Sequence, residues 1–189
     1  MVGSLVSGAI MGRHGRPGRK LRDSGRMKTL LIVFHSRTGG ARQMAEAARA
    51  GASLESGVRV RLLAAADAQG TDVLAADGYI FAAPENLAAM AGQMKEFFDR
   101  TYYEVLERIN GRPYAMLICA GSDGENAARQ MARIATGWRL RPIADPLIVC
   151  THAQTAEAIL APKVIPLADL DHCRDIGTAL AAGMAAGIF

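Results

Sequence analysis

The fold is decided by the stretch LLIVFHSRTGGA at residues 30–41. Its first five residues form a continuous, partly β-branched apolar run, which predicts a strand buried on both faces of a sheet. Residues 41–50 follow with helix-forming side chains and no breaker. A strand that passes directly into a helix is the start of a βαβ unit, and such units place their strands parallel.

The same alternation continues along the rest of the chain. Further strands are predicted at 58–62, 79–83, 115–120 and 147–150, and helices at 90–109, 125–136 and 171–187. Apolar and charged side chains alternate strictly over residues 58–62, as in an edge strand with one solvent-exposed face. The expected α/β fold is therefore flavodoxin-like: a doubly wound, five-stranded parallel sheet in the order 2-1-3-4-5, with helices on both faces. Its ligand crevice would lie in the loops after Phe34, Ala83 and Ala120.

The positive charge of the chain is concentrated at its N-terminus. The 189 residues carry a net charge of +4, which suggests a polyanionic partner. Residues 1–26 hold six basic groups and one acid, which leaves 16 basic and 17 acidic residues, a net charge of −1, for 27–189. We interpret 1–26 as a flexible basic extension and 27–189 as one flavodoxin-like domain. A nucleic-acid-associated protein that uses this extension is an alternative, but we expect no nucleic-acid partner, because charge blocks are usually solvated and no aromatic residue interleaves this one.

The three cysteines are widely spaced and lack the spacing of a disulfide framework or a metal site. We therefore expect no bound metal and a reducing, cytoplasmic setting. No run of 18 apolar residues occurs, so no membrane span is expected either.

The loop after the first strand has the residue types that a phosphate monoester needs. Residues 35–41 read HSRTGGA, with two hydroxyls, two glycines and a helix N-terminus in succession. The alternative is an ordinary turn in which Ser36 or Thr38 caps the helix. The loop is neither a Walker A loop nor a dinucleotide G-x-G-x-x-G motif.

The next two loops contain small residues and a few polar groups. Residues 83–92 read APENLAAMAG, and their backbone groups and Asn86 suit the edge of a heterocycle. The alternative is a proline turn whose asparagine caps the following helix. Residues 120–126 read AGSDGEN, and here the alternative is a plain connection in which Asp123 caps the next helix.

Two of these stretches resemble known motifs. FHSRTGG at 34–40 resembles the phosphate loop of flavodoxin-family proteins, and PENLAAMAGQMKEFFDR at 84–100 resembles the flavin loop and helix of the WrbA-like and NAD(P)H-dependent FMN reductase branch of the flavodoxin-like superfamily. The resemblance extends over 28–189 and implies FMN as cofactor. It assigns the phosphate to Ser36, Arg37, Thr38, Gly39, Gly40 and Ala41. It assigns one side of the isoalloxazine to Pro84, Glu85, Asn86 and Leu87, and the other side to Gly121, Ser122, Asp123 and Gly124. Flavodoxins commonly have a threonine where Ala41 stands, so FMN is expected to be held more weakly here.

The resemblance implies an FMN-binding oxidoreductase that moves electrons from NAD(P)H, as co-substrate, through the flavin to a quinone or similar small acceptor. Loops without aromatic residues leave room for a second substrate, and a nearly neutral domain offers no charged docking face by its total. A flavodoxin-type electron carrier, or a flavin-binding protein without NAD(P)H turnover, remains the alternative. No side chain is predicted as catalytic: His35 and His152 are interpreted as loop or packing residues, and Trp138 as a core or interface residue. The resemblance to WrbA-like proteins, together with the Ala/Met-rich helices, suggests a homodimer or homotetramer.

Overall fold

The computed structural model describes residues 26–189, so residues 1–25 of the predicted basic extension lie outside the described part. Five strands form the main sheet, each overlapping a predicted strand. They are β1 (Lys28–Phe34), β2 (Val58–Ala64), β3 (Gly78–Asn86), β5 (Pro113–Ala120) and β7 (Leu147–Cys150). The predicted strands therefore exist, with ends that differ by up to three residues.

The strand order confirms the predicted doubly wound sheet. The parallel pairs run β2-β1-β3-β5, and β7 pairs with the carboxyl half of β5. Strand β2 is only half buried over most of its length, as predicted for an edge strand. Two short strands were not predicted: β4 (Ala89–Met90) lies antiparallel to β3, and β6 (Arg141–Pro142) pairs with the start of β5.

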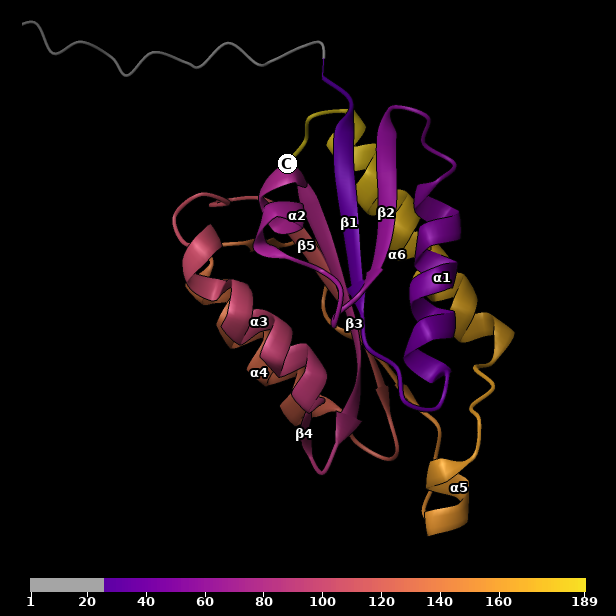
Figure 1. Cartoon of the computed structure of the whole chain (residues 1–189). Coiled ribbons are helices and arrows are strands. Elements are labelled where there is room, and N and C mark those ends of the chain that lie inside the picture. Colours follow the sequence, from indigo (N-terminus) through magenta and orange to yellow (C-terminus); the bar gives the residue numbers. More distant parts are fainter. Residues whose placement is uncertain (1–25) are drawn as a thin grey trace, which may run out of the picture.

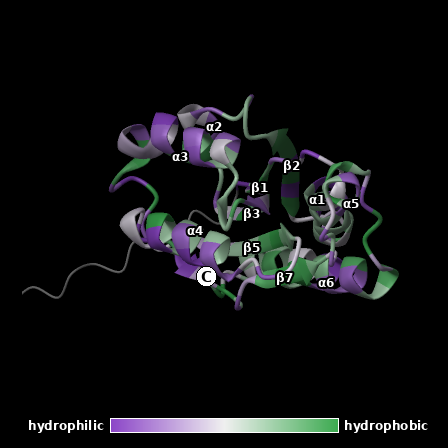
Figure 2. Cartoon of the chain, turned by 90° about the horizontal axis from the view of Figure 1, so that it is seen from below, coloured by the Kyte–Doolittle hydropathy of each residue, from purple (hydrophilic) through white to green (hydrophobic). Residues whose placement is uncertain are grey.

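Helices cover both faces of the sheet (Figures 1 and 2). One face carries α1 (Gly40–Ala52) and α6 (Leu167–Ala185). The other carries α2 (Gly70–Ala75), α3 (Gly92–Val105) and α4 (Glu125–Gly137). A further short helix, α5 (Ala156–Leu160), projects beyond the carboxyl ends of the strands (Figure 1). Helices α2 and α5 were not predicted, because five or six residues are too few for a helical pattern to emerge.

The two faces bury separate hydrophobic clusters. Along β1, Leu30 and Ile32 pack into the cluster beneath α1 and α6, whereas Leu31 and Val33 pack into the cluster beneath α3 and α4. Successive side chains of a strand point to opposite faces, so a strand covered on both sides must be apolar throughout. This is why the run at 30–34 lacks alternation.

The aromatic residues gather in one of these clusters. Trp138 is fully buried among Phe81, Phe97 and Phe98, with its ring centroid 5.3 Å from that of Phe98. Trp138 is therefore a core residue. Met90 and Met94 are buried in the same cluster, so core packing accounts for both methionines.

Helices α1 and α6 pack backbone to backbone. A Cβ atom on Gly51 would overlap the carbonyl oxygen of Arg174, and one on Gly177 would overlap that of Ala48. Only glycine allows so close an approach between two helices. Helix α6 thus packs chiefly on α1 and also contacts the sheet.

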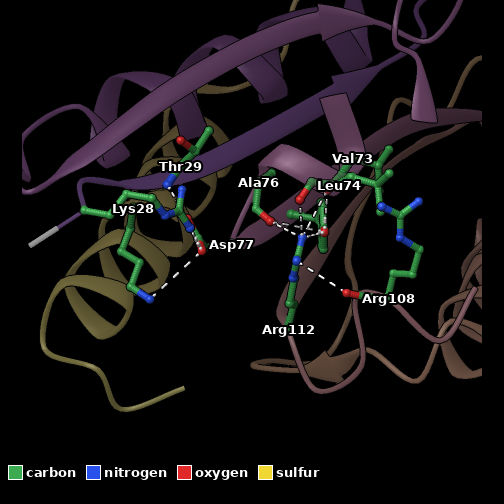
Figure 3. A network of polar contacts seen from close by, with 10 residues as sticks. Lys28, Thr29, Val73, Leu74, Ala76, Asp77, Arg108 and Arg112 are labelled. Carbon is green, nitrogen blue, oxygen red and sulfur yellow. Dashed lines mark hydrogen bonds and ion pairs between the residues drawn. The ribbon is translucent and has the colours of Figure 1, made fainter. Parts of the chain in front are cut away.

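A polar network fixes the amino ends of the strands (Figure 3). Asp77 accepts a hydrogen bond of 2.8 Å from the backbone N–H of Thr29 and lies 4.0 Å from the ammonium of Lys28. Arg112 donates to the carbonyls of Val73, Leu74 and Ala76 at the end of α2. Because the contacts of Arg112 satisfy the last carbonyls of α2, they are structural.

Among residues 26–189, no helix has both the length and the apolar character needed to cross a membrane. The same residues contain no group of three His, Cys, Asp or Glu side chains placed to hold a metal ion.

Candidate functional site

A cavity of about 490 Å³ opens at the carboxyl ends of the strands. This volume lies within the range of small-molecule and cofactor sites. Segments that follow four strands line it: Arg37 and Thr38 after β1; Pro84, Glu85, Asn86, Leu87 and Ala88 at the end of β3; Cys119, Ala120, Gly121 and Ser122 at the end of β5; and Thr151, Ala153, Gln154, Ile159, Leu160 and Lys163 after β7. The structure thus brings the three predicted loops together around one cavity.

The first loop turns directly into α1. Gly39 has φ +91°, a left-handed conformation that suits glycine, and its N–H donates to the Ser36 hydroxyl at 3.1 Å. No side chain caps α1, contrary to the capping alternative for Ser36 or Thr38. By helix geometry, the N–H groups of the first turn have no intrahelical acceptor, so this end of α1 can donate to an anion.

Only two of the six predicted phosphate residues line the cavity: Arg37 and Thr38. Ser36, Gly39, Gly40 and Ala41 stand behind them. Ala41 is buried in the hydrophobic cluster under α1, and Gly40 packs so closely on the Cys119 sulfur that a Cβ atom would overlap it. At 40 and 41 no side chain can donate to a ligand, so only backbone N–H groups remain as possible donors there.

The second loop is a hairpin. Strand β3 continues through Asn86, which pairs with Ala89 of β4, and only Leu87 and Ala88 connect the two strands. Both have positive φ, +51° and +55°, as in a type I′ turn. Helix α3 begins at Gly92 without a side-chain cap, so Asn86 does not have the capping role weighed from the sequence. Pro84, Glu85, Asn86 and Leu87 all line the cavity.

Glu85 connects the second and third loops. Its Oε2 accepts a hydrogen bond of 2.9 Å from the N–H of Gly124. Its Oε1 is buried and has no hydrogen-bond partner among residues 26–189. An unpartnered buried carboxylate oxygen is costly, so such an atom in a cavity wall indicates a place for a donor from a ligand or water.

The third loop contributes Gly121 and Ser122 to the cavity, whereas Asp123 and Gly124 lie outside its lining. Gly124 has φ +89° and precedes α4. The Oδ1 of Asp123 accepts from the N–H of Glu125 at 3.3 Å, close to the capping role weighed as the alternative. Asp123 and Gly124 therefore shape the turn that presents the two residues before them.

Sequence reasoning missed the fourth wall, from Thr151 to Lys163. This segment has no glycine and no paired hydroxyls, so it carries no phosphate or flavin signature. The available signal was positional: a segment that follows the fifth strand must leave the sheet at the same edge as the other three loops.

The fourth wall is attached to the first loop through Lys163 and Gln43. The N–H of Lys163 donates to the Thr38 carbonyl at 2.8 Å. The Gln43 amide donates to the Lys163 carbonyl at 2.6 Å and accepts from the N–H of Ile165 at 3.2 Å. These contacts enclose the cavity at the start of α1.

Burial favours the neutral forms of one histidine and two thiols near the cavity. Burial lowers the pKa of His35, which contacts Gln93, and neither His35 nor His152 lines the cavity. Burial also raises the pKa of the thiols of Cys119 and Cys150. The geometry therefore offers positions for binding a ligand, but no histidine or thiolate is aimed into the cavity.

Comparisons with known proteins agree with this architecture. Residues 64–155 match the profile of the family described as NADPH-dependent FMN reductase. A flavodoxin of Aquifex aeolicus is 35% identical over 86 residues, which is 46% of each chain. An NAD(P)H dehydrogenase (quinone) of Acidithiobacillus ferrooxidans is 33% identical over 95 residues, covering 40% of this chain and 48% of the relative. The chain thus spans about half the length of the curated relatives that it matches.

Solved structures show the same fold over a larger part of the chain. A flavodoxin from the domain Archaea superposes with a TM-score of 0.68 at 20% identity, covering 82% of this chain and 96% of that one. A WrbA-like protein from Agrobacterium tumefaciens gives a TM-score of 0.64 at 18% identity over 85% and 98%. At these identities the likeness concerns the fold.

Proposed function

We propose that this chain, which has a flavodoxin-like fold and whose residues 64–155 match the profile of the NADPH-dependent FMN reductase family, is an FMN-dependent oxidoreductase that passes electrons from NAD(P)H to a quinone or similar small acceptor. The family match and the flavodoxin relative imply FMN. The observation that carries the proposal is the cavity: its lining is polar beside α1 and contains no aromatic side chain.

The residues present fit FMN in two respects. Arg37, Thr38 and the free N–H groups at the start of α1 are donors suited to a phosphate, and the helix dipole favours an anion there. Pro84–Leu87 and Gly121–Ser122 line a further part of the cavity, and none of these residues is aromatic. When bound, FMN supplies the electron-transfer chemistry, and the protein supplies binding and orientation.

In this proposal the role of the protein's own residues is positioning. Glu85 fixes the second loop to the third through Gly124, and Gln43 fixes the fourth wall to the first loop. Ser36 shapes the first loop through Gly39, while Gly40 and Ala41 bring the backbone of α1 to the phosphate. Asp123 and Gly124 shape the third loop in the same way.

An electron carrier is the second candidate, since one of the relatives is a flavodoxin. A carrier docks on a protein partner, for which a strongly charged face is the usual means. Residues 27–189 carry a net charge of −1, and the lining of the cavity contains no aromatic side chain that would stack on a flavin. These two observations favour an enzyme with space for a second small substrate.

The test is made on the purified full-length chain. We expect FMN to bind, as measured by quenching of flavin fluorescence, and Thr38→Ala to weaken binding of FMN more than binding of riboflavin, which lacks the phosphate. We expect the FMN-loaded chain to oxidise NAD(P)H continuously with benzoquinone as acceptor. A chain that binds FMN but is reduced only through a partner reductase would support the carrier, and a chain that binds no flavin would contradict both candidates.

A further inference from the structure

The cavity contains few charges. Among its lining residues, Arg37 and Lys163 are the only cations and Glu85 is the only acid. A phosphate monoester carries a charge of about −1.5 to −2 at neutral pH. The first loop contributes only Arg37 and Thr38 as side-chain donors to the lining, because Ser36 lies outside it.

The backbone of Lys163 lies against the first loop. Its N–H donates to the Thr38 carbonyl at 2.8 Å, and its carbonyl accepts from Gln43 at 2.6 Å. Its Cβ atom would lie 3.4 Å from a Cβ atom on Gly40, the first residue of α1. Lys163 is therefore placed beside the end of α1 that can receive an anion.

The ammonium of Lys163 is oriented but not neutralised. It donates to the carbonyls of Ala158, Ile159 and Ala161 at 2.7, 2.9 and 2.7 Å, which uses its three N–H groups. These acceptors are uncharged, and within residues 26–189 Lys163 makes no ion pair with a carboxylate. Its charge reaches the cavity wall, since it partly offsets the burial that raises the pKa of the Cys119 thiol.

From these contacts we propose that the positive charge of Lys163, a lining residue whose backbone is held in place by Thr38 and Gln43, favours the phosphate of the cofactor and makes the chain prefer FMN over riboflavin. The inference rests on the proposed function, because it concerns the phosphate of the same cofactor. The proposal adds Lys163, a cation of the fourth wall, to the phosphate-loop residues at 34–40. Lys163 acts by its charge at the start of α1, where it adds to the helix dipole and to Arg37.

The experiment compares dissociation constants for FMN and riboflavin in the full chain, by flavin fluorescence, at low and high salt. In Lys163→Gln we expect the FMN dissociation constant to rise about tenfold, because one positive charge near the phosphate is lost. The riboflavin constant should change less than about twofold, and Lys163→Arg should retain most of the preference. The FMN preference of the unsubstituted chain should also fall as salt is raised.

Lys95→Gln is the matched control. It removes the same charge from an exposed position on α3, where Lys95 pairs with Asp99, so a general effect of net charge would appear in it equally. Equal losses for FMN and riboflavin in Lys163→Gln would show that Lys163 only holds α5 in place, and would overturn the proposal. An unchanged FMN constant in this variant would also overturn it. If the unsubstituted chain binds neither flavin, the proposed function fails as well, and the two failures are thereby distinguished.

Discussion

The hairpin turn at Leu87 and Ala88 holds two ordinary L-residues in a conformation that costs them free energy. Their φ values are +51° and +55°, and the left-handed region costs a residue with a Cβ atom about 1–2 kcal/mol. A turn of this type normally contains Asn-Gly. Leu87 is fully exposed, so no burial offsets the cost at that position.

Replacing the turn with its preferred residues should therefore stabilise the chain. Ala88→Gly relieves about 1–2 kcal/mol of strain and loses about 0.4–1 kcal/mol to the greater freedom of glycine in the unfolded state. Leu87→Asn should raise the unfolding free energy by a similar net amount, because asparagine tolerates the left-handed region. Together we expect the unfolding free energy to rise by about 1–2 kcal/mol, which for a domain of this size raises Tm by about 2–8 °C.

The assay is reversible denaturant unfolding and thermal unfolding of the ligand-free full chain. Leu54→Asn serves as the matched control, because Leu54 is also exposed but does not have a positive φ. This control should change the unfolding free energy by less than about 0.5 kcal/mol. A double variant no more stable than the unsubstituted chain, or a control that gains as much, would refute the assignment of strain to this turn.

Three further predictions concern the loops and the core. Gly40→Ala should lower the unfolding free energy by about 1–3 kcal/mol, because the new Cβ atom overlaps the Cys119 sulfur. Adding Cys119→Ala to the same chain should recover part of this loss in a double-mutant cycle. Strictly additive effects of the two substitutions would exclude this contact as the cause. Glu85→Gln should unfold with a free energy about 1–2 kcal/mol higher than Glu85→Ala, because the amide oxygen still accepts the N–H of Gly124; equal values in denaturant titrations would show that this bond contributes nothing. Burial raises the pKa of Tyr79 from 10.0 to about 12, so its contribution to stability is complete below about pH 10 and is lost as the pH rises to about 12. We expect a loss of about 2–3 kcal/mol over that interval from unfolding at stepped pH, and a shallower loss in Tyr79→Phe; the same slope in both chains would contradict the shift.

The alternation of strands and helices could be predicted because burial on two faces imposes a pattern that local sequence records. The apolar run at 30–34 and the alternating run at 58–62 each became the kind of strand expected, internal and edge. The hairpin at 84–90 could not be predicted. Pro84 indicates a turn, and the true turn at Leu87 and Ala88 lacks the asparagine and glycine that would mark it.

The candidate site was likewise predictable only in part. Loops with glycine and hydroxyl residues are recognisable from local sequence, and three such loops meet at one cavity. The fourth wall depends on contacts over a long separation: Gln43 and Lys163 are 120 residues apart. Nothing near Lys163 marks it as a cavity residue, because its position is set by the pairing of β7 with β5 and by the amide of Gln43.

The backbone contact between α1 and α6 has a consequence for which sequence changes the chain can accept. Gly40 packs on the Cys119 sulfur at the cavity end of α1, and Gly51 packs on the carbonyl of Arg174 eleven residues later, about 16 Å along the axis. One residue inserted between them would rotate one contact by about 100° relative to the other and shift it by about 1.5 Å. The length of this stretch is therefore under as strong a constraint as its composition. Among related chains, insertions and deletions should spare residues 40–51 and collect instead in the segment around α5, where no residue of the helix is buried.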